Sequence, residues 1–236
     1  MVYYLITFGA GDSNHIEAAK RLCKQAESAD VFDKIIMYTI DDLHADKEFW
    51  DKHSNFIQTN PRGFGYWLWK PYIIKTTMDM MNDGDILVYL DSGCEIDKKR
   101  RDTILEYFKI VEKDYIIGSR DHWIEKNWVK MDVILKLDML DDKHLNTKVN
   151  QAGANMYYVF KNTRSLVNEW YELCCEYNLI DDTPSNASNI SSYIEHRHDQ
   201  SIFSLLTKKY DLFSEHDISK CLDYRRNRTG VSSYEI

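Results

Sequence analysis

An aspartate directly follows a strongly apolar segment of the chain. Residues 86–90 read ILVYL and are followed by Asp91, Ser92 and Gly93. A carboxylate at the end of a buried segment must be solvated, hydrogen-bonded or paired with a cation, because burying it without a partner is costly. Two interpretations meet this requirement. Asp91 either binds a divalent cation bridged to a diphosphate, for which its oxygen atoms suit Mg²⁺ or Mn²⁺, or it stabilises a simple turn with Gly93.

Large aromatic residues and a lysine precede this segment. Residues 62–71 read RGFGYWLWKP, in which Gly63 and Gly65 permit backbone conformations that other residues avoid. Lys70 lies at the start of a predicted helix, where its positive charge opposes the helix dipole. A phosphate or sugar hydroxyl bound at that end would satisfy both the lysine and the free helix N–H groups. Trp67 either lines such a site or packs in the core.

An acidic residue also precedes the last predicted helix. Residues 195–203 read EHRHDQSIF. Asp199 is a good N-cap for the helix that follows, and a carboxylate there could equally orient or deprotonate a reacting hydroxyl group. We expect His196 and His198 to lie on a solvent-exposed flank, since two histidines without other partners do not make a zinc site.

These residues must be positioned by strands and helices that alternate along the chain. Apolar and β-branched runs predict the strands, and amphipathic runs of about 10 to 15 residues predict the helices between them. The alternation predicts an α/β fold with a mostly parallel central sheet flanked by helices. Ligands bind beyond the carboxyl ends of such strands, where we expect residues 7–9, 91–93 and 151–153. Strands are predicted at 2–9, 33–40, 85–91, 114–119 and 155–162, and helices at 15–27, 71–81, 99–113, 163–177 and 199–210.

Composition narrows the class of protein. The 236 residues suit one domain, and a net charge of -8 with both signs mixed along the chain argues against a nucleic-acid partner, which would need a concentrated basic face. The five cysteines lack C-x-x-C spacing, which indicates reduced thiols. No signal peptide or membrane-spanning segment is apparent, so we expect a cytoplasmic location.

Three blocks of the sequence resemble one enzyme family. Residues 82–93, NDGDILVYLDSG, are similar to nucleotide-sugar glycosyltransferases of the GT-A fold, in which an apolar strand ends in a D-x-D motif that binds the metal and the donor diphosphate. Residues 63–74, GFGYWLWKPYII, resemble the segment before this turn in a subgroup of small glycosyltransferases. Residues 197–206, RHDQSIFSLL, resemble the Asp-Gln segment near the acceptor in these enzymes. The blocks span most of the chain from 62 to 208.

The resemblance implies a domain plan and a reaction. One GT-A-like domain would cover 1–236, with a nucleotide-sugar-binding half at 1–118, an acceptor-side half at 119–215 and a C-terminal tail at 216–236. The enzyme would move a sugar from a nucleoside-diphosphate sugar, such as a UDP- or GDP-sugar, to a hydroxyl group of a glycan or glycoconjugate. It would be a hexosyl- or pentosyltransferase.

The resemblance also implies roles for single residues. Lys70 and Asp199 would be catalytic, the first at the donor and the second at the acceptor. The donor would be bound by Thr7, Phe8, Gly9, Lys70, Asp91, Ser92 and Gly93. The acceptor would contact Trp67, Trp128, Lys130, Gln151, Asn155 and Gln200, because aromatic rings stack on sugars and amides both donate and accept hydrogen bonds. Alternatively, residues 121–132 form a plain amphipathic helix, and residues 151–155 form a tight turn.

The resemblance is incomplete at the metal site. Asp-Ser-Gly stands where the family pattern more commonly reads Asp-x-Asp, so the second carboxylate is missing from its usual place. We expect Asp91 to hold Mn²⁺ or Mg²⁺ with His216 or Glu95 as a further ligand, because Mn²⁺ also accepts imidazole. Two other classes remain open. A catalytically silent sugar- or nucleotide-binding relative would keep the aromatics, and a sugar-phosphate nucleotidyltransferase would carry a basic glycine-rich loop that residues 8–15, FGAGDSNH, lack.

Overall fold

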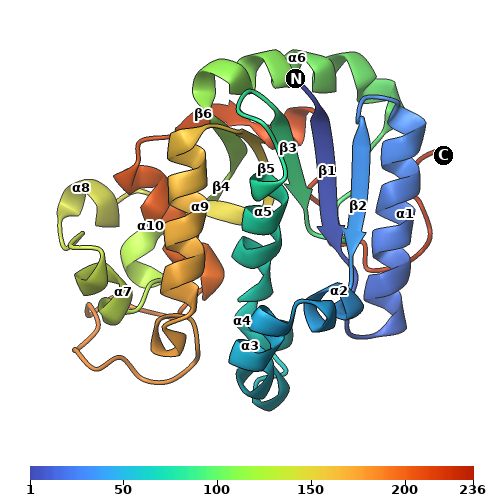
Figure 1. Cartoon of the computed structure of the whole chain (residues 1–236). Coiled ribbons are helices and arrows are strands. Elements are labelled where there is room, and N and C mark those ends of the chain that lie inside the picture. The colour runs from blue at the N-terminus through green and yellow to red at the C-terminus, as the bar shows by residue number, and fades with distance from the viewer.

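One sheet runs through the centre of the protein (Figure 1). The computed structural model describes all residues, 1–236. The strands are β1 (Tyr3–Phe8), β2 (Lys34–Tyr38), β3 (Ile86–Leu90), β4 (Ile116–Ile124), β5 (Lys148–Tyr158) and β6 (Phe213–Asp217). Their order in the sheet is β2-β1-β3-β5-β4-β6, and only β5 runs antiparallel to its neighbours. The predicted α/β fold with a mostly parallel sheet in one domain is confirmed.

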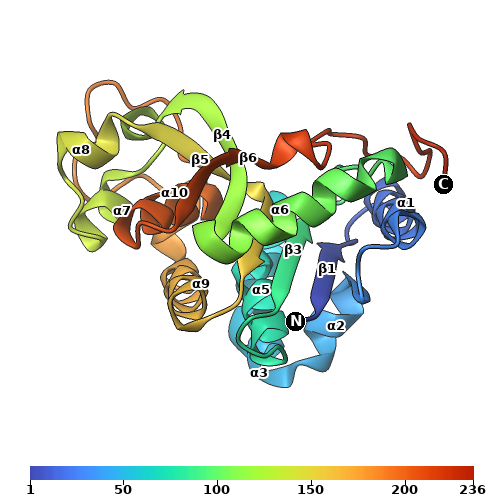
Figure 2. The ribbon, with the colours of Figure 1, turned by 90° about the horizontal axis from the view of Figure 1, so that it is seen from above.

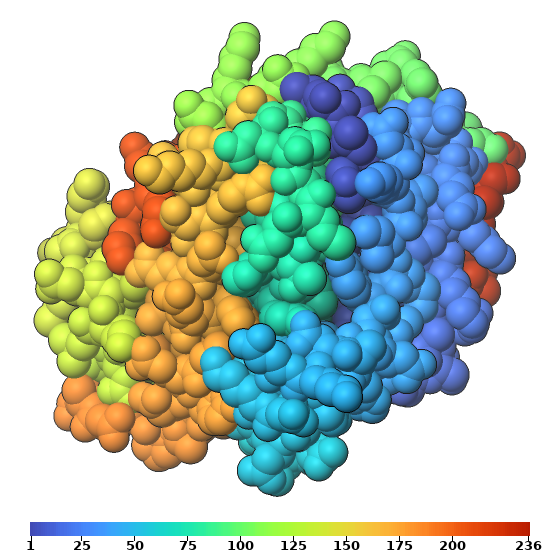
Figure 3. Space-filling model, viewed as in Figure 1, coloured from blue at the N-terminus to red at the C-terminus, as the bar shows by residue number.

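Helices cover both faces of the sheet. They are α1 (Ser13–Ala29), α2 (Ile40–Ala45), α3 (Lys47–Thr59), α4 (Gly63–Tyr66), α5 (Trp69–Asp79), α6 (Arg101–Asp114), α7 (Met131–Lys136), α8 (Asp142–Leu145), α9 (Lys161–Cys174) and α10 (Asp199–Lys209). Helices α5 and α9 lie over the face turned to the viewer, and α3 lies below them, beyond the carboxyl ends of the strands (Figure 1 and Figure 3). Helices α1 and α6 lie on the opposite side, as the view from above shows (Figure 2). No helix has the length and apolar character needed to cross a membrane.

The alternation of side chains along β3 creates two cores. Leu87 and Tyr89 belong to the larger apolar cluster, whereas Ile86, Val88 and Leu90 belong to the smaller one on the other face. All five are fully buried, because both faces of a central strand are covered by helices. The apolar run of the sequence is therefore explained, and Asp91 is the first residue beyond it.

Strands β4 and β5 are longer than the sequence predicts. Strand β5 begins at Lys148 rather than 155, and β4 continues to Ile124, so residues 121–124 are strand and not helix. The two strands extend each other by antiparallel pairing, which local propensity does not reveal. Strand β6 was not predicted, because its sequence FSEHD is polar and mostly exposed at the sheet edge. It contains residue 216, so the expected tail boundary falls inside a strand.

The end of the chain crosses back over the sheet edge towards α1 (Figure 1). Asp223 forms an isolated β-bridge with Glu95, and Ser233 donates hydrogen bonds to the Glu95 carboxylate from its backbone N (2.9 Å) and from Oγ (2.8 Å). We call residues 223–234 the C-terminal strap. It is anchored at both ends, and its middle passes over the carboxyl ends of β1 and β3.

Candidate active site

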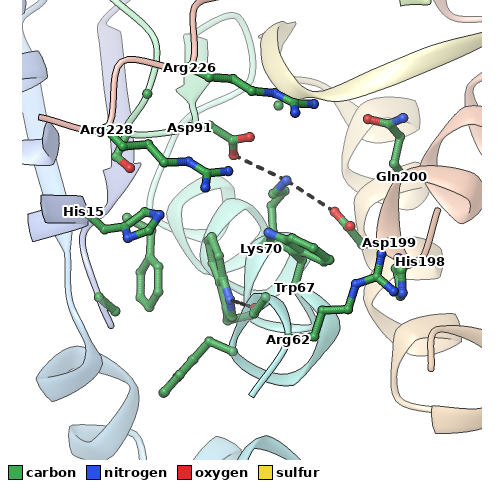
Figure 4. Close-up of a pocket in the computed structure, with 18 of the residues that line it drawn as sticks. His15, Arg62, Trp67, Lys70, Asp91, His198, Asp199, Gln200, Arg226 and Arg228 are labelled. Carbon is green, nitrogen blue, oxygen red and sulfur yellow. Dashed lines mark hydrogen bonds and ion pairs between the residues drawn. The ribbon is translucent and has the colours of Figure 1, made fainter. Parts of the chain in front are cut away.

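A pocket of about 500 Å³ lies beyond the carboxyl ends of β1 and β3. Its walls come from segments far apart in sequence: the tip of β1, the 61–70 block, the 91–93 turn, the start of α10 and the C-terminal strap. Figure 4 shows the side chains that converge there. This is the edge at which ligands are expected in such sheets.

The block before α5 forms a left-handed turn. Five consecutive residues have positive φ angles: Gly63 (58°), Phe64 (55°), Gly65 (80°), Tyr66 (51°) and Trp67 (62°). This conformation disfavours residues with a Cβ atom, at roughly 1–2 kcal/mol each. Glycine is also required at 65 for space, since a Cβ there would lie 2.8 Å from the Ile57 side chain. The turn directs Trp67 into the pocket and is the kind of strain that concentrates at functional sites.

Lys70 lies between two carboxylates. Its Nζ is 3.3 Å from Asp91 Oδ1 and 3.4 Å from Asp199 Oδ2, while only 5% of its side chain is exposed. Burial alone would lower the pKa of Lys70, but the two carboxylates outweigh it and hold this pKa above its usual range. The two ion pairs account for a lysine at the start of α5, without the bound phosphate that the helix dipole argument invoked.

Asp91 faces the pocket. Its side chain is 38% exposed, its Oδ1 accepts a hydrogen bond from the Tyr89 hydroxyl (2.6 Å), and its backbone N donates to Gly153 O (2.8 Å). A Cβ on Gly153 would lie 2.6 Å from Asp91 Oδ2, so a glycine in β5 makes room for the carboxylate. The strand end is therefore open, as a ligand-binding role requires.

Asp199 is the first residue of α10 and not its cap. The N-cap is His198, with φ 56° and ψ -127°, so the Asp199 carboxylate turns to Lys70 instead of closing the helix. The Asp199 side chain is buried, and its Oδ2 accepts no hydrogen bond of good geometry. Burial raises the pKa of Asp199, Lys70 lowers it and Asp91 raises it again, giving about 6.

Both histidines before α10 are buried, which corrects the expectation of an exposed flank. The His198 ring stacks on Tyr66 (centroids 5.0 Å apart), and its Nε2 lies 3.0 Å from Asp182 Oδ1. Burial, with Arg62 nearby, lowers the pKa of His198 to about 4, so the ring is neutral at pH 7. His196 is 2% exposed, with Nε2 2.8 Å from Leu179 O. Polar partners in the loop at 179–182 compensate for this burial.

The predicted donor residues are only partly brought together. Phe8 lines the pocket and stacks on Trp69 (centroids 3.9 Å apart), and Ser92 and Gly93 also line it beside Asp91. Thr7 is fully buried and lies outside the pocket lining. Gly9 is buried too, and a Cβ there would lie 2.8 Å from Met37 Cε. Thr7 and Gly9 thus serve packing at the strand tip.

The predicted acceptor residues divide in the same way. Trp67 and Gln200 line the pocket. Trp128 lies outside it, stacked on Trp123 (centroids 4.4 Å apart), and the Arg197 guanidinium lies over Trp123 at 4.5 Å. Gln151 is likewise outside, within β5 and not in a turn, and donates to Asp121 Oδ2 (3.2 Å).

Two other predicted acceptor residues are structural. Lys130 is 1% exposed, and its Nζ donates to Asn178 O (2.6 Å) and pairs with Asp181 Oδ1 (3.1 Å). Asn155 is fully buried inside β5 and donates to Gln151 O (3.1 Å). Neither side chain lines the pocket, because both are used to hold buried backbone in place.

Arginines that the sequence analysis missed dominate the charge of the pocket. Five line it, namely Arg62, Arg197, Arg225, Arg226 and Arg228, against two acids, Asp91 and Asp199. In a chain with a net charge of -8, this is a local excess of positive charge. The signal for three of them was the basic run YRRNR at 224–228, which lies in the segment that we expected to be a C-terminal tail. The pocket can therefore attract an anionic ligand.

The expected metal ligands are not brought together. His216 lies on β6, with Nδ1 2.9 Å from Asp114 Oδ2, outside the pocket. Glu95 is fully buried and occupied by the C-terminal strap. No group of three or more His, Cys, Asp and Glu side chains is close enough to hold a metal ion. Asp91, already paired with Lys70, stands alone, so the donor set does not fit a resident divalent metal.

Comparisons with known proteins give a likeness of structure only. No protein-family model and no curated protein sequence matches the chain. The structure is similar to mouse xyloside xylosyltransferase 1 (12% identity, TM-score 0.47), covering 92% of this chain and 86% of that one. It is similar to a glycosyltransferase involved in glycosylation of the major capsid of PBCV-1 (9% identity, TM-score 0.48), covering 94% of this chain and 86% of that one. It is also similar to the galactosyltransferase LgtC in complex with donor and acceptor sugar analogues (15% identity, TM-score 0.45), covering 97% of this chain and 84% of that one.

Proposed function

We propose that this protein is a glycosyltransferase that moves a sugar from a nucleoside-diphosphate sugar to a hydroxyl acceptor on a glycan or glycoconjugate. One observation carries the proposal: Lys70 joins Asp91 and Asp199 at the base of a positively charged pocket beyond the strand ends. The positive charge of the pocket would attract a donor with an anionic diphosphate. The two carboxylates beside Lys70 could accept hydrogen bonds from hydroxyl groups of the donor sugar and of the acceptor.

The donor would lie along the β1 and β3 ends. Its nucleoside would be near Phe8 and its diphosphate over the turn formed by Ser92 and Gly93, which all line the pocket. Lys70 keeps its charge at neutral pH and adds positive potential below the leaving diphosphate, where negative charge grows in the transition state. Trp67, which Figure 4 shows beside Lys70, would present an aromatic surface for a sugar ring.

Asp199 would act on the acceptor. The acceptor oxygen forms a bond to the anomeric carbon, the bond from that carbon to the phosphate oxygen breaks, and the diphosphate leaves with the electron pair. Asp199 Oδ2 is paired with Lys70 Nζ at 3.4 Å but accepts no hydrogen bond of good geometry, so a hydroxyl group bound there would supply one. Asp199 orients this hydroxyl and, in a reaction that inverts configuration, takes its proton.

A donor screen tests the proposal. The protein is incubated with UDP- and GDP-sugars and with mixed glycan acceptors, and released nucleoside diphosphate is measured beside direct binding of UDP and GDP. Release that depends on acceptor and is lost in Asp199→Asn supports the transferase. Binding without release under any condition indicates a silent nucleotide-binding relative. Release of pyrophosphate from a nucleoside triphosphate and a sugar phosphate indicates a nucleotidyltransferase, and absence of any nucleotide binding overturns the proposal.

A further inference from the structure

We propose that arginines of the C-terminal strap, and not a bound metal ion, neutralise the diphosphate of the donor. This inference rests on the proposed function, but concerns how the anion is held. It begins from the disagreement described above: the family pattern implies a metal, and the side chains of this pocket do not supply its ligands.

The strap is fixed to the Asp91 turn by a buried arginine. Arg21 of α1 is 2% exposed and donates through Nη2 to Ser92 O (2.8 Å) and Cys94 O (2.8 Å), and through Nη1 to Asn227 O (3.1 Å). One guanidinium thus binds the backbone of the turn and of the strap together. The backbone N of Asn227 also donates to Gly93 O (3.0 Å). The strap therefore has a defined position over the turn.

Its far end is equally well anchored. Gln25 of α1 donates to Ser232 Oγ (2.7 Å) and to Glu95 Oε1 (3.2 Å), and Glu95 is fully buried. A Cβ at Gly93 would lie 3.2 Å from Arg225 O, which shows how closely the strap covers the turn. These contacts fix the strap on the C-terminal side of Arg226 and Arg228, as the contacts of Asn227 fix it between them.

Two strap arginines are uncommitted and turned inward. Arg226 and Arg228 are exposed and line the pocket. Figure 4 shows the Arg226 guanidinium above Asp91 and Lys70, and the Arg228 guanidinium beside Asp91 on the side of His15. By contrast, Arg225 lies 3.3 Å from Asp223 and over the Tyr234 ring. Exposed guanidinium groups without acid partners, aimed at a cavity, suit a polyanion with which they can make bidentate hydrogen bonds.

The charge count supports the same assignment. Lys70 is taken up by Asp91 and Asp199, and Arg62 is paired with Asp182 (3.1 Å) and Glu195 (2.7 Å). Arg197 is committed too, 3.8 Å from Glu195 and over the Trp123 ring, and Arg225 pairs with Asp223 as described above. Arg226 and Arg228 remain for the diphosphate, which carries a negative charge on each phosphate. Guanidinium groups then do what a divalent cation does elsewhere: they hold both phosphates and stabilise the leaving group. The free Oδ2 of Asp91 is left to face the donor sugar.

Calorimetry with UDP, GDP and pyrophosphate as probes tests this inference, with the full chain in EDTA or in Mn²⁺. We expect the Kd of the best nucleoside diphosphate in EDTA to stay within about threefold of its value in Mn²⁺. Arg226→Gln and Arg228→Gln should each raise that Kd about tenfold, since a hydrogen bond to a charged group contributes at this level. Arg101→Gln, which removes an exposed charge on α6 away from the pocket, is the matched control and should leave the Kd unchanged.

The outcomes separate the inference from the proposed function. Binding that appears only with Mn²⁺ or Mg²⁺ overturns the metal-free assignment and leaves the transferase intact. Binding in EDTA that both arginine variants retain overturns the role of the strap. Failure of every probe with and without metal overturns the proposed function itself. Melting temperatures of the variants, measured without ligand, show whether a loss of binding comes from loss of folding.

Discussion

Lys70 near the start of α5 and Asp199 at the start of α10 meet at the base of the pocket, with Nζ 3.4 Å from Oδ2, and neither side chain is more than 5% exposed. Burial raises the pKa of Asp199. The positive charge of Lys70 lowers this pKa and the negative charge of Asp91 raises it again, so that its value is about 6. The result is a carboxylate that is ionised at neutral pH and still basic enough to accept a proton. Such tuning is characteristic of catalytic acids and bases.

Replacing Asp199 by Asn should abolish transfer without abolishing donor binding. The amide keeps the shape but cannot take a proton, and a lost general base lowers kcat by about 10² to 10⁴-fold. Lys70 keeps Asp91 as a partner, so we expect nucleoside diphosphate to bind within a few-fold of the parent. Steady-state kinetics and calorimetry measure the two effects separately. A variant with near-normal kcat would remove Asp199 from the chemistry.

The pH dependence of kcat should follow the same carboxyl group. Asp199 must be ionised to accept the acceptor proton, and its pKa is raised to about 6, so kcat rises with pH and levels off above about 7. His198 does not contribute, because its pKa is lowered to about 4 and it stays neutral through this range. A pH profile of kcat at saturating substrates checks this. A flat profile between about pH 5 and 8 would contradict the role of Asp199.

Gly153→Ala should disturb the site through Asp91. The added Cβ would lie 2.6 Å from Asp91 Oδ2 and 2.9 Å from the Tyr224 hydroxyl, so the carboxylate must move. We expect kcat/KM to fall at least about tenfold, since such small displacements of positioned groups are costly. A double-mutant cycle with Asp91→Ala gives the control: the effect of Gly153→Ala should become smaller when the carboxylate is absent, with the contact to Tyr224 remaining. Fully additive effects would show that Gly153 does not act through Asp91.

The sequence predicted the three charged residues at the centre of the site for physical reasons. An apolar strand covered on both faces cannot bury a bare carboxylate, so Asp91 needed solvent, a hydrogen bond or a cation where the strand ends. Lys70 opposes its helix dipole, from which we predicted a bound phosphate or sugar hydroxyl, whereas the structure pairs it with Asp91 and Asp199. Asp199 was marked by the helix that follows and by the family resemblance.

The arginines could not be placed from sequence. Arg226 and Arg228 reach the pocket because hydrogen bonds to Arg21 and Glu95 fix the strap. Both of these residues are buried, and both are more than 100 positions away in the sequence. No local pattern encodes such contacts. His196 was misassigned for a related reason: a polar side chain is buried when tertiary partners exist, and these lie in a distant loop. The helices and central strands, set by periodicity, were easier to find.

Gly65→Ala should destabilise the protein more than Gly11→Ala, although both glycines have positive φ angles, 80° and 92°. At Gly11 nothing lies within 4 Å of an added Cβ, so only the backbone strain of about 1 kcal/mol applies. At Gly65 the Cβ also meets Ile57, at 2.8 Å from its side chain and 3.2 Å from its Cα, and overpacking adds about 1–3 kcal/mol. Urea unfolding of both variants measures the difference. Equal losses of unfolding free energy would contradict this prediction. They would mean that the backbone at 63–67 can shift to relieve the contact with Ile57, and that this turn does not hold Trp67 and Lys70 rigidly in place.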